Sequence, residues 1–177
     1  MTRTIYPPPD PDRMIGIDRD SGDAPVVTRF GPVKVIQHGR FREVWNGSIA
    51  WMGTHPDWWQ RYPSHDELVE VATGHALVSG LGCAFDSNRI SGLVDSMNIV
   101  EISAWMIAAC SQFAPANATI IESPIDDYLT NDRIRAPIYD TVYFDHSNNP
   151  YTTEDRRRYH RLLEGWLKPD ANVVFWD

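Results

Sequence analysis

The stretch HALVSGLGCAFDSN, residues 75–88, decides the fold. A run of small apolar residues typical of a buried strand leads directly into Gly80 and Gly82, and the small residue Ala84 follows. Glycine has no Cβ atom, so its backbone can turn tightly and approach a ligand closely. Taken alone, a G-x-G pair is compatible with a ligand-binding loop or with a simple tight turn. The surrounding pattern has to decide between the two.

Short apolar runs alternate with helical segments after this point. They predict strands at 76–80, 98–103, 118–123, 139–145 and 172–177, with helices at 87–96, 104–114 and 153–167. Apolar strands without hydrophobic–polar alternation are typical of parallel sheets that helices cover on both faces. The pattern therefore predicts an α/β fold with a doubly wound, mostly parallel, five-stranded Rossmann-like sheet in three α/β/α layers.

The chain before this sheet divides into two parts. Residues 1–29 are rich in Pro, Asp and Gly, a composition that predicts an irregular amino-terminal arm. Residues 30–62 contain β-prone runs, and the Asn46-Gly47 pair between two of them is a strong hairpin signal. We therefore expect a small antiparallel β unit, followed by one Rossmann-like domain over 63–177.

Composition and charge exclude several classes of function. The 177 residues carry a net charge of −8 and no basic stripe, so a nucleic-acid partner is not expected. No apolar run approaches the ~20 residues of a membrane span, and the first residues lack a signal-peptide pattern. The two cysteines and the scattered histidines lack metal-ligand spacing, so no metal is predicted. We expect a cytoplasmic protein that acts on a small molecule.

The position of the glycines and of one acid favours a ligand site. In open parallel sheets ligands bind at the carboxyl ends of the strands, where Gly80, Gly82 and Ala84 fall. Glu101 ends the next strand, close to the ~20-residue offset at which an acid binds ribose hydroxyls. The alternative is a solvent-exposed glutamate at a strand end. Because Asp86 would repel a pyrophosphate, an adenosyl ligand without phosphate fits better.

These residues resemble the class I S-adenosylmethionine-dependent methyltransferases, and most closely their spermidine synthase-like branch. The likeness covers about residues 63–177, through ALVSGLGCA, NIVEIS, YDTVYFDHSNNP and NVVFWD, and the third stretch is similar to the branch's Y-D-x-I-x-x-D-S-S-D-P motif. The hairpin unit and the segment SHDEL, at 64–68, also resemble parts of that branch.

The resemblance implies S-adenosylmethionine as the cofactor and assigns roles to several residues. The glycine loop with Ala84 would lie against the methionine and ribose parts, and Glu101 would hold the ribose. Asp126 is the acid nearest to the place where the family binds the adenine amine. Asp145, at the end of the fourth strand, would face the reacting centre. His146 beside it is placed to take a proton near neutral pH, or else faces solvent.

The sequence also departs from this family. Cys83 stands where the aminopropyl-transferring members carry Asp, and Asn148 replaces the second Asp of D-S-S-D. We therefore expect a methyltransferase, with a spermidine synthase-like aminopropyltransferase as the first alternative. The second alternative is a catalytically degenerate binding or assembly protein that keeps the fold.

The last predicted strand bears on assembly. Residues 172–177 would form an apolar edge strand, whose unpaired backbone groups are available to another chain unless something covers them. Either the amino-terminal hairpin covers this edge or a second copy pairs with it. Because twofold dimers are the commonest soluble assembly, we expect a homodimer.

Overall fold

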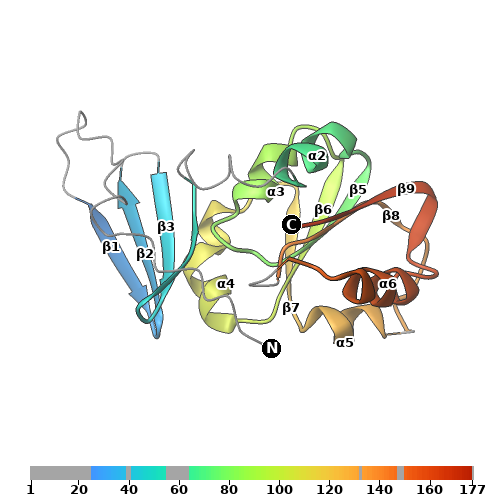
Figure 1. Ribbon diagram of the computed structural model, residues 1–177. Coiled ribbons are helices and arrows are strands. Elements are labelled where there is room, and N and C mark those ends of the chain that lie inside the picture. Colours follow the sequence, from blue (N-terminus) through green and yellow to red (C-terminus); the bar gives the residue numbers. More distant parts are fainter. Residues whose placement is uncertain (1–24, 39–40, 55–63, 132, 147–149, 177) are drawn as a thin grey trace.

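Two β-sheets form the framework of the protein (Figure 1). The structure is a computed structural model that describes residues 25–38, 41–54, 64–131, 133–146 and 150–176. A four-stranded antiparallel sheet comes first along the chain, and a five-stranded parallel sheet follows. Residues 1–24 of the predicted arm and 55–62 of the predicted β unit lie outside the described residues.

The antiparallel sheet has the strand order β1-β2-β3-β4. Its strands are β1 (Val26–Phe30), β2 (Val33–His38), β3 (Phe41–Asn46) and β4 (Ile49–Gly53). The predicted hairpin at Asn46-Gly47 is confirmed, because Gly47 has a φ of +58° and joins the paired strands β3 and β4. β1 includes residues 26–29, which the sequence placed in the irregular arm. Its pairing with β2 is what makes it a strand.

The parallel sheet confirms the predicted α/β fold. Its strands are β5 (His75–Ser79), β6 (Ser96–Glu101), β7 (Ala118–Glu122), β8 (Tyr139–Phe144) and β9 (Leu167–Phe175). They lie in the order β7-β6-β5-β8-β9, and every neighbouring pair is parallel. The chain first runs outward from β5 to β7 and then returns to the other side of β5. The order therefore reverses between β5 and β8, and such reversals are where this class of sheet binds ligands.

Helices cover both faces of the parallel sheet (Figure 1). They are α2 (Ser64–Val71), α3 (Phe85–Ile90), α4 (Ala104–Cys110) with a 3-10 turn (Ser111–Phe113), α5 (Ile125–Leu129) and α6 (Thr153–Leu162). Several predicted boundaries were wrong, among them those of the strand predicted at 98–103, which lies at 96–101. The helix predicted at 87–96 lies at 85–90, and the one predicted at 153–167 ends at Leu162. The last strand begins at Leu167 and not at residue 172, because Gly165, with a φ of +82°, turns the chain early.

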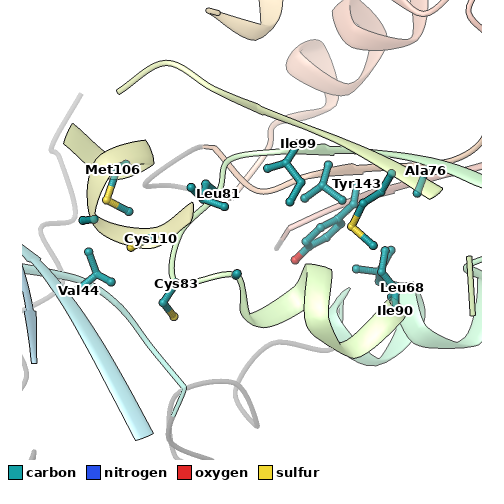
Figure 2. Packing of buried hydrophobic residues seen from close by; sticks show 14 of the residues in the cluster. Val44, Leu68, Ala76, Leu81, Cys83, Ile90, Ile99, Met106, Cys110 and Tyr143 are labelled. Atoms are coloured by element: carbon teal, nitrogen blue, oxygen red, sulfur yellow. The ribbon is translucent and has the colours of Figure 1, made fainter. Parts of the chain in front are cut away.

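The alternation of side chains along the strands produces two cores. Ala76 and Val78 of β5 pack with α2, α3 and α4, whereas Leu77 between them packs with α5 and α6. The first core also takes in Val44 of β3, which lies with Cys83 and Met106 in Figure 2. The antiparallel sheet therefore shares a hydrophobic core with the parallel sheet.

Strand β9 lies at an edge of its sheet, as the sequence predicts. Val174 and Phe175 are only 2% and 3% exposed, so these apolar side chains face the core. Pro169 and Asp170, whose φ is +64°, interrupt the first half of the edge, and such interruptions discourage pairing with another chain. The homodimer stays a prediction.

Candidate ligand-binding site

The loop of residues 80–84 joins β5 to α3 in an unusual backbone conformation. Gly80, Gly82 and Ala84 have φ values of +97°, +49° and +58°. A Cβ atom on Gly80 would lie 2.8 Å from the carbonyl oxygen of Asp145, which follows β8. Glycine is needed at position 80 because the two strand ends pass so close to each other. The loop is therefore held at the point where the strand order reverses.

The side chain of Glu101 is hydrogen-bonded to the backbone of this loop. Its Oε2 accepts the backbone N–H of Leu81 at 2.9 Å, and its Oε1 accepts the N–H of Ser103 at 2.8 Å. The side chain is 8% exposed, so Glu101 is not a solvent-exposed glutamate at a strand end. The spacing of about 20 residues along the chain does bring an acid to the glycine loop. Each carboxylate oxygen has a further lone pair with which it can accept a hydrogen bond from a ligand hydroxyl.

The antiparallel sheet closes one side of the loop. The sulfur of Met52, on β4, accepts a hydrogen bond from the N–H of Cys83 at 3.4 Å. The same sulfur lies against Gly82 and leaves no room for a Cβ atom there. Nothing in the sequence near Met52 indicates this contact, because it joins residues 31 positions apart on different sheets. Met52 thus adds a thioether to the surroundings of the site.

Asp145 and His146 lie on different faces of the sheet. Asp145 shares its face with Tyr143 and lies near Asp86 of α3, whereas His146 contacts Tyr159 of α6. Consecutive residues at a strand end point in opposite directions, so the two side chains do not converge on one group. Burial, and then the negative charge of Asp86, raise the pKa of Asp145 well above its ordinary value of 3.8.

His146 is bound by hydroxyl groups on both ring nitrogens. Its Nδ1 lies 2.6 Å from Oγ of Ser79 and 3.0 Å from the hydroxyl of Tyr151, and its Nε2 lies 2.9 Å from the hydroxyl of Tyr159. His146 is exposed as a residue, but aromatic rings pack against its imidazole, and the resulting loss of water around the ring lowers the pKa of His146 to about 4. At pH 7 the imidazole is therefore neutral and already hydrogen-bonded.

The structure adds a buried pair that sequence reasoning missed. Nδ1 of His65, on α2, lies 2.8 Å from Oδ1 of Asp86, in the first turn of α3. Both residues are buried, at 5% and 4% exposure. They are 21 positions apart, and the scattered histidines gave no spacing that could have joined them. Asp86 follows the glycine loop by two residues, so the pair joins α2 to the end of this loop.

Asp126 has a different set of contacts. Its Oδ2 accepts a hydrogen bond from the guanidinium of Arg158, on α6, at 2.5 Å. Its described contacts are therefore with the α6 side of the sheet and not with the glycine loop. The structure thus brings the loop together with Glu101 and with Asp145, but it does not add Asp126 to them.

The part of the chain that the structure describes contains neither a membrane-spanning helix nor a metal-binding cluster. None of its helices is both long and apolar enough to cross a membrane. The described residues also contain no group of three or more His, Cys, Asp or Glu side chains that could hold a metal ion.

Comparison with known proteins supports the fold alone. No protein-family model matches the sequence, and no curated protein matches it either. Among solved structures, spermidine synthase from Thermotoga maritima matches with a TM-score of 0.55 and 14% identity over 80% of this chain. A spermidine synthase in complex with the transition-state analogue AdoDATO matches at 0.54 and 12% identity over 81% of this chain. The DhpI–SAM–HEP complex matches at 0.51 and 23% identity over 64% of this chain.

The chain has the class I methyltransferase fold. This confirms the fold that the resemblance implied. The chain spans about half the length of these structures, 53%, 52% and 51% respectively. In this methyltransferase fold, the glycine loop after β5 and Glu101 after β6 occupy the carboxyl edge of the sheet.

Proposed function

We propose that the chain is an S-adenosylmethionine-dependent methyltransferase acting on a small molecule. The observation that carries this proposal is the direct hydrogen bond between Glu101 and the backbone of the glycine loop, on a methyltransferase fold. A carboxylate held beside a loop that a ligand can approach closely supports a site for ribose hydroxyls.

The residues at this edge fit such a cofactor. Gly80 and Gly82 have no side-chain atoms that could block the cofactor's methionine part, and both adopt positive φ angles that glycine tolerates. Glu101 can accept hydrogen bonds from the ribose. Ile102, next to Glu101, is 68% exposed and offers an apolar surface against which the adenine ring can lie. When bound, S-adenosylmethionine supplies a methyl group that its sulfonium sulfur has already activated.

The task left to the chain is mainly to position the methyl acceptor, which can contribute several kcal/mol to catalysis. Asp145 lies at the end of β8 beside Gly80, where the acceptor would meet the cofactor. Its raised pKa suits a carboxyl group that orients the acceptor and exchanges a proton with it. His146, bonded to Ser79 and Tyr159, acts from the opposite face as a support for the end of β8.

One observation favours aminopropyl transfer as a second candidate. The spermidine synthases match over 80% and 81% of this chain, against 64% for the DhpI complex. The two reactions are separated by supplying decarboxylated S-adenosylmethionine with putrescine. A methyltransferase gives no aminopropylated product with this pair, whereas an aminopropyltransferase does. Binding of the cofactor without product from any acceptor is expected of a degenerate binding protein.

The Glu101→Gln variant tests the cofactor site. We expect it to weaken S-adenosylmethionine binding by about 1.5–3 kcal/mol, the value of a hydrogen bond to a charged group, which is about 10- to 150-fold in affinity. The thermal midpoint should also fall, because the amide of Gln can accept only one of the two backbone N–H groups. Calorimetric titration and thermal unfolding give the two results.

Glu122→Gln is the matched control for this variant. Glu122 ends the neighbouring strand β7, in register with Glu101, and is exposed. It should leave both the affinity and the thermal midpoint unchanged. Equal affinities for Glu101→Gln and the wild type would remove Glu101 from the cofactor site.

A further inference from the structure

A buried carboxylate beside the glycine loop has one oxygen atom without a partner. Asp86 lies in the first turn of α3 and is 4% exposed. Its Oδ1 is held by Nδ1 of His65, but its Oδ2 has no hydrogen-bond partner among the described residues. A buried charged acceptor that stays unsatisfied costs free energy, so such an atom in a native protein requires an explanation. A ligand that donates a hydrogen bond would provide one.

The surroundings of Asp86 hold its carboxylate in place. His65 is 5% exposed, and the hydroxyl of Tyr143, on β8, lies 3.2 Å from the same Nδ1 that contacts Asp86. The ring of Phe85 packs edge-on against His65, with 5.9 Å between the ring centroids. The imidazole is therefore supported by α3 and β8 together. It holds Oδ1, and Oδ2 is the carboxylate oxygen that has no partner among the described residues.

A second acidic group lies close by. Asp145 follows β8, and its carbonyl oxygen passes Gly80 at the start of the glycine loop. Burial raises the pKa of the Asp145 carboxyl group, and the negative charge of Asp86 raises it further. The two carboxyl groups come from two elements that the fold brings together at the reversal of strand order. A positive charge at this point would be attracted by Asp86 and would favour the ionised form of Asp145.

The loop itself supplies no acid. Cys83 is fully buried, and burial raises the pKa of its thiol, so this side chain stays neutral. Asp86 is the first acidic residue after Cys83 along the chain. The negative charge nearest to the loop in sequence is therefore on α3.

We propose that Oδ2 of Asp86 accepts a hydrogen bond from the ammonium group of the cofactor's amino-acid end, with His65 as the positioning residue for the carboxylate. This inference rests on the proposed S-adenosylmethionine site. Asp86 would then recognise the amino-acid end of the cofactor, which nucleotides such as ATP lack.

Two ligands that differ only in this ammonium group test the inference. S-Adenosylhomocysteine carries it, has no sulfonium charge and cannot react, whereas its des-amino analogue has hydrogen in its place. Wild-type protein should bind S-adenosylhomocysteine about 10- to 150-fold more tightly, the factor for a hydrogen bond to a charged group. In Asp86→Asn this preference should largely disappear, while affinity for the des-amino analogue stays within about twofold. Calorimetric titration measures all four affinities.

Two further variants complete the experiment. Asp66→Asn removes a carboxylate whose side chain is 69% exposed and pairs with Arg89, so it should keep the full preference for the ammonium group. His65→Gln should reduce the preference by a smaller factor than Asp86→Asn, without changing affinity for the des-amino analogue. A purely structural role for His65 would weaken both ligands equally.

The results separate this inference from the proposed function. Wild-type protein that binds neither ligand contradicts the cofactor site itself. Wild-type protein that binds both ligands equally keeps the cofactor site and overturns the role of Asp86, even if Asp86→Asn does not fold. A loss of equal size for both ligands in Asp86→Asn overturns that role as well.

Discussion

Replacing Gly80 by alanine is expected to destabilise the protein by about 2–4 kcal/mol, from a left-handed backbone and a steric clash together. The φ of +97° is one that residues with a Cβ atom rarely adopt, and the new Cβ would lie 2.8 Å from the carbonyl oxygen of Asp145. Relief of the clash would push the glycine loop away from the end of β8. The variant should therefore also lose S-adenosylmethionine binding. Urea unfolding and calorimetry measure the two effects.

Substitutions at two other glycines separate the effect of the backbone conformation from that of the steric clash. Gly47 also has a positive φ, of +58°, but nothing lies within 4 Å of its Cβ position, so Gly47→Ala should cost about 1–2 kcal/mol from the backbone alone. Gly92 has neither feature, and Gly92→Ala should be close to neutral. Losses of equal size at Gly80 and Gly47 would show that the close approach to Asp145 contributes nothing.

S-Adenosylmethionine binding is expected to strengthen with rising pH, by up to about tenfold per unit if one proton is released. Asp145 keeps its proton above the ordinary value of 3.8, because of burial and the charge of Asp86. A cation bound beside it lowers its pKa, so binding expels the proton. Titrations between pH 5 and 7 keep the cofactor's amino group protonated, since its pKa is about 8. In the Asp145→Asn variant, the affinity for S-adenosylmethionine should lose this dependence on pH.

Ionisation of Asp145 with rising pH has the opposite effect on the stability of the fold, which decreases. Between 3.8 and the raised value, the folded protein holds a proton that the unfolded chain has released, so Asp145 makes the fold less stable as the pH rises. Asp145→Asn removes this loss and should raise the thermal midpoint at neutral pH. A pH dependence of binding that is the same in Asp145→Asn and the wild type would assign the proton to another group.

The sequence predicts the parallel sheet well because the signal is strong there. Each strand from β5 to β8 is a short apolar run, and the buried sheet needs apolar side chains on both faces. The sequence predicts boundaries less well where the backbone conformation of a single residue ends or bends an element. Gly165 ends α6 early, and Asp170, with a positive φ, bends β9 without ending it. Helix α5 has five residues, too few for a helical period to show in the sequence.

The site was predictable only where it follows the order of the strands. The glycine loop and Glu101 each follow a strand directly, so their approach could be foreseen from parallel pairing. The His65–Asp86 pair and the contact of Met52 with the loop could not, because tertiary packing brings together residues 21 and 31 positions apart. Asp126 stays a prediction for the adenine end of the site; in the structure its Oδ2 pairs with Arg158, a contact that nothing in the sequence indicates.

The most direct test of the proposed function is calorimetric titration of the wild-type chain with S-adenosylmethionine, S-adenosylhomocysteine and ATP. We expect both sulfur-containing ligands to bind in the micromolar range typical of enzyme substrates. ATP should not bind, because Asp86 would repel its phosphates at the start of α3. Absence of binding by both sulfur-containing ligands at millimolar concentration would contradict the cofactor site, and would leave a protein that has the methyltransferase fold without its cofactor.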